Sequence, residues 1–210
     1  MNTPKELVPV TARGEATRSK LLAAAEIEIG EKGFHTASVS SITTRADVGQ
    51  GTFYLYFHTK DEIFLTLVAD IGRRLRRHMA VAIEGADNRI VAERRGLEAF
   101  FEFAEAHPGL YRIVQEAQFV DEKVFRDYYE LLAQGYAKDL AEAADRGELS
   151  PGDPVIRAWT IMGIGHFLGM RWCLWQGRKP GPELVDAVMD FITHGIGPRE
   201  IGGGDGGPLP

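Results

Sequence analysis

The sequence has little of what stabilises exported or membrane-spanning proteins. Its 210 residues include one cysteine, Cys173, and a single cysteine cannot form an intrachain disulfide. No apolar run approaches the ~20 residues that a membrane-spanning helix requires, and the N-terminus lacks the hydrophobic segment of a secretory signal. We therefore expect a cytoplasmic protein, because a reducing compartment suits a chain without disulfides.

An excess of positive charge is also absent, since 24 Lys and Arg face 30 Asp and Glu, for a net charge of −6. This acidity is unevenly distributed along the chain. Residues 1–60 carry seven basic and six acidic side chains, whereas residues 61–210 carry seventeen and twenty-four. The first part therefore lacks the net negative charge that would oppose binding to a polyanion, which permits nucleic-acid binding there without demonstrating it.

The patterns of an enzyme site are missing as well. The six histidines are scattered, with no metal-ligand spacing, at positions 35, 58, 78, 107, 166 and 194. Neither a phosphate-binding glycine loop nor a nucleophile elbow occurs. We expect a protein that is not an enzyme, has no catalytic residues and uses no metal or other cofactor.

No segment alternates between apolar and polar residues as a hairpin strand does, so the predicted fold class is all-α. Helices are indicated by apolar residues at intervals of three and four, by prolines in first turns and by glycines at helix ends. In one of them Ile63, Leu67, Ile71 and Leu75 share a face, and Thr59 with Glu62 predicts a capping box at its start. The predicted helices span residues 15–32, 39–46, 50–57, 60–83, 88–106, 108–117, 121–147, 153–176 and 182–195.

Two short predicted helices joined by a tight turn follow a longer supporting helix, which is the arrangement of a helix-turn-helix unit. Their sequence, GFHTASVSSITTRADVGQGTFYLYFHTK from Gly33 to Lys60, resembles the signature of the TetR family of transcriptional regulators. Thr17-Arg18 and the Leu21–Ala25 segment also match the first helix of that family. The resemblance at motif level covers about residues 17–64, and beyond it only the order of helices is similar.

The resemblance divides the chain into four parts. We expect a flexible arm at 1–14, a helix-turn-helix DNA-binding domain at 15–60, a ligand-binding and dimerisation bundle at 61–196, and a disordered Gly/Pro-rich tail at 197–210. A small core should fix the angle between the two short helices, formed by Val39, Ile42, Ala46, Val48, Phe53 and Phe57.

The outward residues of this unit are hydroxyl, amide and phenol groups, which suit hydrogen bonds to phosphates and base edges. An amide can pair bidentately with adenine, so Gln50 is the predicted base reader. By resemblance, the contact positions of the recognition helix are Gln50, Gly51, Thr52, Tyr54 and Tyr56. The flanking contacts to the DNA backbone are then Ser38, Thr43, Thr44, Arg45, His58 and Lys60. A helical hairpin with solvated hydroxyls is the alternative interpretation.

Three residues depart from the family pattern. Asp47 replaces the glycine of the turn, but Asp tolerates the left-handed backbone that the turn needs. Gly49 replaces a serine cap, which costs about a few tenths of a kcal/mol. Glu28 stands where the family prefers an apolar residue. We expect the unit to form despite all three.

The predicted helix 153–176 is apolar on nearly every side, so one protomer alone cannot shield it from water. By resemblance, it forms a four-helix dimer interface together with helix 182–195. The expected interface residues are Trp172, Trp175, Leu184, Val188 and Phe191. The alternative is that these side chains form the ordinary core of a monomer.

The bundle of the family also encloses a ligand cavity, and aromatic residues are frequent on the corresponding helices here. By resemblance, the cavity residues are Phe100, Phe103, Tyr111, Gln115, Phe119, Phe125, Tyr128, Trp159, Met162, Gly163, His166 and Phe167. An aromatic stripe is more often plain core than the wall of a ligand site. The stretch 107–150 is similar to acyl-CoA-responsive members, so an acyl-CoA is the first candidate effector. The cluster of Arg73, Arg74, Arg76 and Arg77 could meet its phosphates, form a solvated face or be an electrostatic partner for the acidic bundle.

Together these features predict a bacterial repressor that binds a palindromic operator as a homodimer and is released by a small hydrophobic effector. The expected partners are double-stranded operator DNA, the effector and a second copy of the chain, with no membrane. A transcriptional activator and a DNA-binding protein without a ligand remain alternatives.

Overall fold

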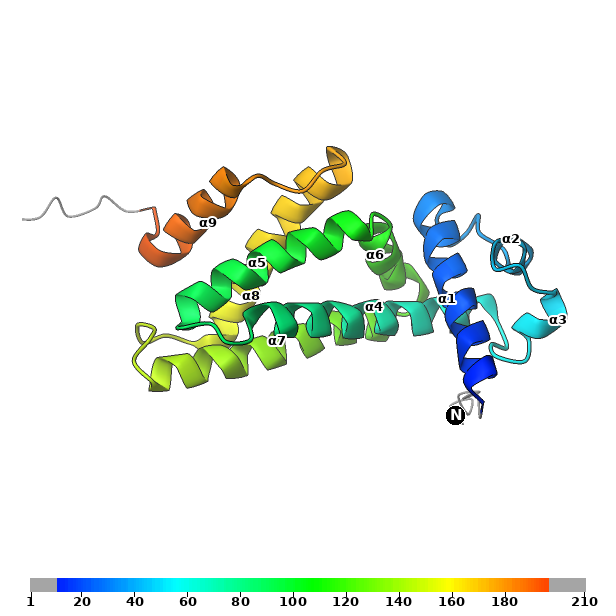
Figure 1. Ribbon diagram of the computed structural model, residues 1–210, viewed down its shortest axis with the longest axis horizontal. Coiled ribbons are helices and arrows are strands. Elements are labelled where there is room, and N and C mark those ends of the chain that lie inside the picture. Colours follow the sequence, from blue (N-terminus) through cyan, green and yellow to red (C-terminus); the bar gives the residue numbers. More distant parts are fainter. Residues whose placement is uncertain (1–10, 197–210) are drawn as a thin grey trace, which may run out of the picture.

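The computed structural model describes residues 11–196. Three helices form a small unit at one end of the elongated molecule (Figure 1): α1 (Ala12–Lys32), α2 (Val39–Arg45) and α3 (Gln50–Phe53). A bundle forms the other end, and its helices are α4 (Lys60–Ile83), α5 (Arg89–Ala106), α6 (Leu110–Val120), α7 (Glu122–Asp145), α8 (Pro154–Gly169) and α9 (Pro182–His194). The described residues contain no strand, so the predicted all-α class is confirmed.

The helix-turn-helix unit is formed by α2 and α3 supported on α1. Ser38 caps α2, because its hydroxyl accepts from the Ser41 amide at 3.0 Å while the Ser41 hydroxyl accepts from the Ser38 amide at 3.1 Å. Asp47 in the turn has φ +53°, so the predicted left-handed conformation is confirmed. The predicted core is also confirmed: Val39 and Val48 pack against it half-buried, and the buried members are Ile42, Ala46, Phe53 and Phe57.

Two boundaries of this unit differ from the prediction. The first helix begins at Ala12 rather than at residue 15, because the Thr11 hydroxyl accepts from the Gly14 amide and caps it. Residues 12–14 therefore belong to α1 and not to an arm, while residues 1–10 lie outside the described part. The recognition helix α3 ends at Phe53 instead of residue 57, and the chain continues in turns in which the Phe57 amide still donates to the Phe53 carbonyl at 3.0 Å.

Helix α4 joins the two ends of the molecule (Figure 1). Its predicted stripe of Ile63, Leu67, Ile71 and Leu75 is fully buried. Thr59 caps the helix as predicted, by accepting from the Glu62 amide at 3.0 Å. The prediction of the reciprocal bond of the capping box is wrong, because the Glu62 carboxylate accepts from the amide of His58 rather than from that of Thr59.

The remaining helices follow the predicted order with shifted ends. Helix α6 begins at Leu110, so Pro108 precedes the helix instead of occupying its first turn. The predicted helix 153–176 is α8 followed directly by a π-helical segment, η1 (Met170–Trp175). Pro154 and Pro182 occupy first turns, as expected. No helix in residues 11–196 is both long and apolar enough to cross a membrane, and the predicted tail at 197–210 lies outside the described residues.

Candidate functional site

The segment that begins at Gln50 presents its polar side chains outward from a rigid base. Phe53 and Phe57 are fully buried and hold the segment against α1 and α2, while Tyr54 between them is 53% exposed. A Cβ atom built on Gly51 would meet nothing within 4 Å, so the backbone there is open to close approach by a ligand. Among the other predicted contacts, Thr52 and Tyr56 are half-buried, and the exposed side chains are Ser38, Thr44, Arg45, Gln50 and His58.

Two residues that were predicted to contact DNA, Thr43 and Lys60, instead bond to backbone carbonyls within the protein. Thr43 is 2% exposed, and its hydroxyl donates to the Ser40 carbonyl at 3.1 Å, so it cannot reach a phosphate. The Lys60 ammonium donates to the carbonyls of Phe34 at 2.7 Å and Ala37 at 2.9 Å, and it lies 4.3 Å from the centre of the Phe34 ring. Its charge therefore stabilises the loop before α2, and we remove both residues from the predicted DNA surface.

Glu28 is a buried carboxylate at the base of the helix-turn-helix unit. Its side-chain oxygens accept from Lys32 Nζ and Arg45 Nε, each at 2.6 Å, and the residue is 3% exposed. The hydrogen bond from Lys32 and that from Arg45 outweigh the effect of burial and lower the pKa of Glu28 to about 2. Arg45 also donates to Glu31 at 2.9 Å, so the guanidinium that the sequence assigned to DNA ties α2 to α1.

Sequence reasoning treated Glu28 only as a departure from the family pattern. The signal that could have revealed its role was the charge itself, because a carboxylate at a core-facing position of a helix requires a cationic partner. Arg45 stands in the helix that packs on this face, and Lys32 follows one turn later on α1.

Helix α6 holds the C-terminal half of α1 and so connects the small unit to the bundle. Glu26 of α1 pairs with Arg74 of α4 and with His107, each at 2.5 Å. Burial alone would raise the pKa of Glu26, but the bonds from His107 and Arg74 together lower it. Arg112 of α6 donates to the Glu31 carbonyl at 2.7 Å, and the Glu116 carboxylate accepts from the Phe34 amide.

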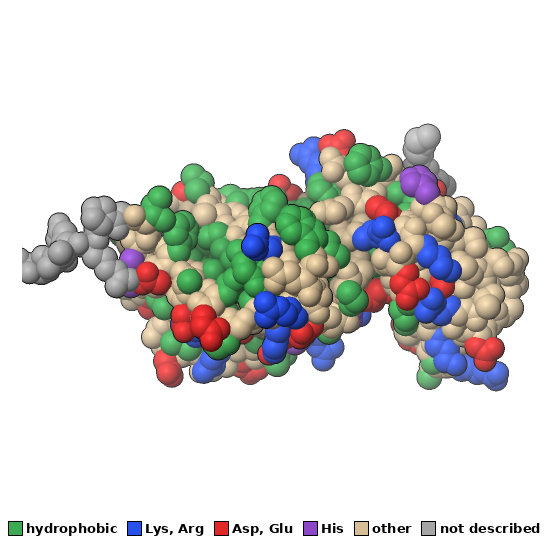
Figure 2. Space-filling view, turned by 90° about the horizontal axis from the view of Figure 1, so that it is seen from above, with side chains coloured by type: hydrophobic (Ala, Val, Ile, Leu, Met, Phe, Trp, Pro, Cys, Tyr) green, Lys and Arg blue, Asp and Glu red, His purple; other side chains and the backbone are tan. Residues whose placement is uncertain are grey.

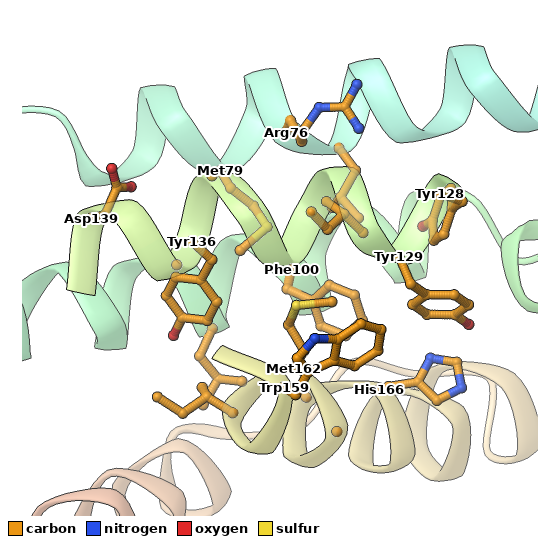
Figure 3. A pocket seen from close by; sticks show the side chains of 18 of the residues that line it. Arg76, Met79, Phe100, Tyr128, Tyr129, Tyr136, Asp139, Trp159, Met162 and His166 are labelled. Carbon is orange, nitrogen blue, oxygen red and sulfur yellow. The ribbon is translucent and has the colours of Figure 1, made fainter. Parts of the chain in front are cut away.

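A cavity of about 830 Å³ lies inside the bundle, between α4, α5, α6, α7 and α8 (Figure 3). Its wall is mainly aromatic and aliphatic, with polar groups at its ends, as is typical of small-molecule sites. Eight of the predicted residues line it, and these are Phe100, Tyr111, Phe125, Tyr128, Trp159, Met162, Gly163 and His166.

The structure places the other four predicted cavity residues elsewhere. The Phe103 ring is buried against His107, with ring centres 4.4 Å apart, and does not line the cavity. Phe119 and Phe167 are 81% and 65% exposed. Gln115 lies with Phe119 at a separate hollow next to Gly30 and Leu174. Helical order identified the right helices, but it could not identify which face of each helix turns inward.

Several lining residues were not predicted. Met79 extends the buried stripe of α4 by one turn beyond Leu75, and this spacing could have revealed it. Tyr136 follows Tyr129 at seven residues on the same face of α7, which is also a helical repeat. Charged residues line the cavity as well, and these are Arg76, Arg89, Glu93, Arg126, Glu130, Lys138 and Asp139.

The polar groups of the cavity lie mostly in a desolvated environment. Burial raises the pKa of Tyr129 to about 12, and it raises the pKa values of Tyr111, Tyr128 and Tyr136 further. Burial also lowers the pKa of His166. These phenols and the imidazole are therefore neutral hydrogen-bonding groups near pH 7.

An apolar surface runs along α8 and η1, where Figure 2 shows hydrophobic side chains gathered on the outer face of the bundle. Its exposed members are Ile156, Trp159, Phe167, Leu174, Trp175 and the neighbouring Phe191 of α9. Of the predicted dimer residues, Trp175 and Phe191 lie here, whereas Trp172 and Leu184 are half-buried and Val188 belongs to the core of the protomer.

A helix-turn-helix unit with an open recognition segment, mounted on a helical bundle that encloses a cavity, defines a DNA-binding transcriptional regulator. The comparisons with known proteins agree. Residues 21–67 match the family described as bacterial regulatory proteins, tetR family. Over 192 residues the chain is 34% identical to the HTH-type transcriptional regulator YdgC of Bacillus subtilis, covering 90% of this chain and 96% of YdgC. The chain belongs to the TetR family, whose members are transcriptional regulators and not enzymes.

Solved structures share the fold. The fatty acid degradation regulator FadR from Bacillus halodurans has a TM-score of 0.73 at 22% identity, covering 86% of this chain and 96% of that one. FadR from Bacillus subtilis, solved in complex with stearoyl-CoA, has a TM-score of 0.69 at 22% identity, with 85% and 99% covered. At these identities the likeness establishes the architecture alone.

Proposed function

We propose that the protein is a ligand-responsive transcriptional repressor of the bacterial cytoplasm, which binds a palindromic operator as a homodimer and leaves it when a small hydrophobic effector binds. The observation that carries this proposal is that α4 both lines the aromatic cavity and packs against α1 of the DNA-binding unit. A ligand in the cavity therefore touches a helix that also supports the recognition segment.

DNA recognition rests on α3 in the major groove. Gln50 at its first turn reads a base edge, Gly51 allows close approach, and the Tyr54 hydroxyl binds a phosphate. The open surface at Gly51 and the exposure of Tyr54 support this assignment. Ser38, Thr44 and His58 flank the segment as contacts to the DNA backbone.

Two copies of the chain present two such segments to a symmetric operator. The exposed apolar residues of α8 and η1, with Phe191 of α9, are the surface that a second copy would cover. Large side chains such as Phe167 and Trp175 are costly to leave in water, and a patch of this kind is typical of an interface.

The effector that we propose first is an acyl-CoA. The cavity volume of about 830 Å³ and its apolar wall suit a long hydrocarbon chain, and FadR of Bacillus subtilis shares the fold and was solved with stearoyl-CoA. The effector acts by shifting a population: it releases DNA only if it binds better to the conformation in which α4 and α6 hold α1 at a spacing that no longer fits the operator.

The test is a gel-shift titration of the protein on the DNA upstream of its own gene, followed by addition of palmitoyl-CoA or of CoA alone. We expect retention of the fragment by the protein, release by palmitoyl-CoA, and no release by CoA. Gln50→Ala and Tyr54→Ala should each weaken retention by about fivefold or more, since a base or phosphate contact of this kind is worth about 1–3 kcal/mol. Lys123→Ala, a substitution on the exposed surface of α7, serves as the matched control.

Transcription in vitro from the same fragment separates the alternatives. A repressor lowers transcript yield and the acyl-CoA restores it, whereas an activator raises the yield. Retention that no hydrophobic compound changes would leave only a DNA-binding protein without an effector. Unchanged retention by the Gln50→Ala and Tyr54→Ala variants would contradict the proposed recognition segment.

A further inference from the structure

Three arginines line the cavity. Arg126 of α7 is largely exposed and lies 3.9 Å from the Glu122 carboxylate. The charges of the other two, Arg89 and Arg76, are balanced very differently. Arg89 of α5 is 8% exposed, and its Nε donates to Glu93 at 2.6 Å. Asp139 lies 3.8 Å from the same guanidinium, and the Tyr136 hydroxyl donates to Glu93. The buried cation is thus already neutralised by carboxylates. Lys138 also lines the cavity, but its side chain is exposed and its ammonium lies 3.8 Å from the Glu142 carboxylate.

Arg76 of α4 is half-buried at the cavity wall, and within residues 11–196 no carboxylate lies within 4.0 Å of it. Its guanidinium lies over Gly72, where a Cβ atom would come within 3.3 Å of the Arg76 Nη1 and 3.2 Å of the Tyr128 ring. On the same helix, Arg73 and Arg74 both pair with Asp70. Arg76 is therefore the cavity arginine whose charge the protein leaves unbalanced.

Neutral polar groups extend inward from this arginine. The Tyr128 ring lies 5.1 Å from that of Tyr129, and the Tyr129 ring lies 6.0 Å from that of His166. The hydroxyls of the two tyrosines and the ring nitrogens of His166 have no hydrogen-bond partner among the described residues, although all three line the cavity. Figure 3 shows Tyr128, Tyr129 and His166 together at one end, with Tyr136 and Asp139 at the other.

The apolar wall lies between these two ends, formed by Met79, Phe100, Trp159 and Met162. A ligand that fills the cavity thus meets hydrocarbon and aromatic surface along its length. Of the cationic side chains that line the cavity, Arg76 alone has no carboxylate within 4.0 Å among the described residues. An anion buried near a cation of this kind is stabilised, whereas beside the Glu93 and Asp139 carboxylates it would be repelled.

We infer that the effector is an amphiphile whose anionic group, a carboxylate or a phosphate, binds Arg76, and whose apolar body extends past Phe100 and Trp159 toward Tyr136. The planar guanidinium suits either group, because both accept two parallel hydrogen bonds. The Tyr128 and Tyr129 hydroxyls add neutral donors beside it. This inference rests on the proposed role of the cavity as the effector site, and it specifies which end of the cavity binds the anionic group of the effector.

The experiment measures the affinity of the full chain for three probes, dodecanoate, 1-dodecanol and dodecanoyl-CoA. Binding is followed by calorimetry and by tryptophan fluorescence, to which Trp159 in the cavity wall contributes. The first two probes share a twelve-carbon chain and differ in charge. We expect wild-type protein to bind dodecanoate or dodecanoyl-CoA at least about tenfold more tightly than 1-dodecanol, since a charged hydrogen bond is worth about that factor or more. Arg76→Gln should remove this advantage and leave the affinity for 1-dodecanol unchanged.

Arg77→Gln is the matched control, because Arg77 is the next residue of α4, is exposed and does not line the cavity. Arg76→Lys keeps the charge and should retain part of the anion preference. Melting curves of all variants establish that they fold.

The two anionic probes distinguish the sources of the charge. If Arg76→Gln loses affinity for dodecanoate, the group that binds Arg76 is a carboxylate. If the variant loses affinity for dodecanoyl-CoA alone, that group is a phosphate of CoA. Either result supports the inference. Equal binding of 1-dodecanol by the wild type, or an Arg76→Gln variant that keeps its anion preference, overturns the inference while the effector site survives. If none of the three probes binds wild-type protein, the proposed effector site fails and the inference fails with it.

Discussion

Gly30 of α1 and Gly109, the residue before α6, meet backbone to backbone. A Cβ atom built on Gly30 would come within 2.8 Å of the Gly109 Cα, and one built on Gly109 within 2.7 Å of the Gly30 Cα. Separations this short do not occur between real side chains and backbone, so neither position accepts a larger residue without a shift. The contact joins the DNA-binding unit to the bundle at the point where Arg112 and Glu116 also hold α1.

Gly30→Ala is expected to push α1 away from α6. The free energy of unfolding should fall by about 1–3 kcal/mol, the usual cost of overpacking, and DNA release should need more effector because α6 no longer moves α1 directly. Thermal unfolding and the gel-shift titration measure the two effects. Gly135→Ala is the control for stability alone, because Gly135 lines the cavity: its Cβ would meet nothing within 4 Å, so helix propensity should raise stability by up to ~1 kcal/mol.

Glu28 predicts an acid-sensitive contribution to stability. Its pKa is lowered from 4.5 to about 2 in the folded protein by its bonds from Lys32 and Arg45. A carboxyl group with a lowered folded pKa contributes stability above its unfolded pKa, and this contribution is lost as the pH falls from about 4.5 toward 2. Denaturant unfolding at a series of pH values should therefore show a steeper acid decline for wild-type protein than for Glu28→Gln.

The same variant should also weaken DNA binding near pH 7, because Arg45 of α2 loses the buried one of its two carboxylate partners on α1 and keeps only Glu31. Glu142→Gln, at an exposed position of α7 whose contact with Lys138 is long, is the control and should change neither property. An acid decline of the same slope in wild type and Glu28→Gln would show that Glu28 is not the group responsible.

How much of the fold and of the candidate site could be predicted from the sequence depends on whether each feature is determined by nearby residues or by tertiary packing. The stripe from Ile63 to Leu75 was predictable because helical periodicity identifies a buried face directly. Asp47 was predictable because few residues tolerate φ near +53°. Both properties are local, and a short window of sequence contains all the information that they need.

The cavity was predictable only in part because it depends on how helices are rotated against each other. Phe100 and Phe103 stand three residues apart on α5, yet Phe100 lines the cavity and Phe103 packs against His107. The bonds of Lys60 at the start of α4 could not be predicted for the same reason: its carbonyl partners, at Phe34 and Ala37, are more than twenty residues away in sequence. Such contacts are set by tertiary packing, which no spacing rule reports.

Lys60 thus gives a prediction that separates a structural lysine from one that binds DNA. A lysine that neutralises a phosphate contributes about 0.9 to the slope of log affinity against log salt concentration. Because the Lys60 ammonium is bonded to carbonyls, Lys60→Met should leave this slope unchanged while it lowers the melting temperature. Gel shifts between 50 and 200 mM salt, about the range over which such slopes are measured, give the comparison. A slope reduced by about one unit in a normally folded variant would return Lys60 to the DNA surface.

The apolar face of α8 gives the clearest test of assembly. Phe167 is 65% exposed in the protomer, so Phe167→Glu removes no core contact and should leave the fold of one chain intact. If a second copy covers this face, the buried glutamate would lack a partner and the dimer should dissociate. Sedimentation velocity then measures a shift from dimer to monomer, with DNA affinity falling because one recognition segment alone reads half an operator. Leu131→Glu, at a similarly exposed apolar residue on α7, is the matched control. Should both variants sediment like the wild type, the second copy binds elsewhere, and the exposed side chains of α8 and η1 would require another partner.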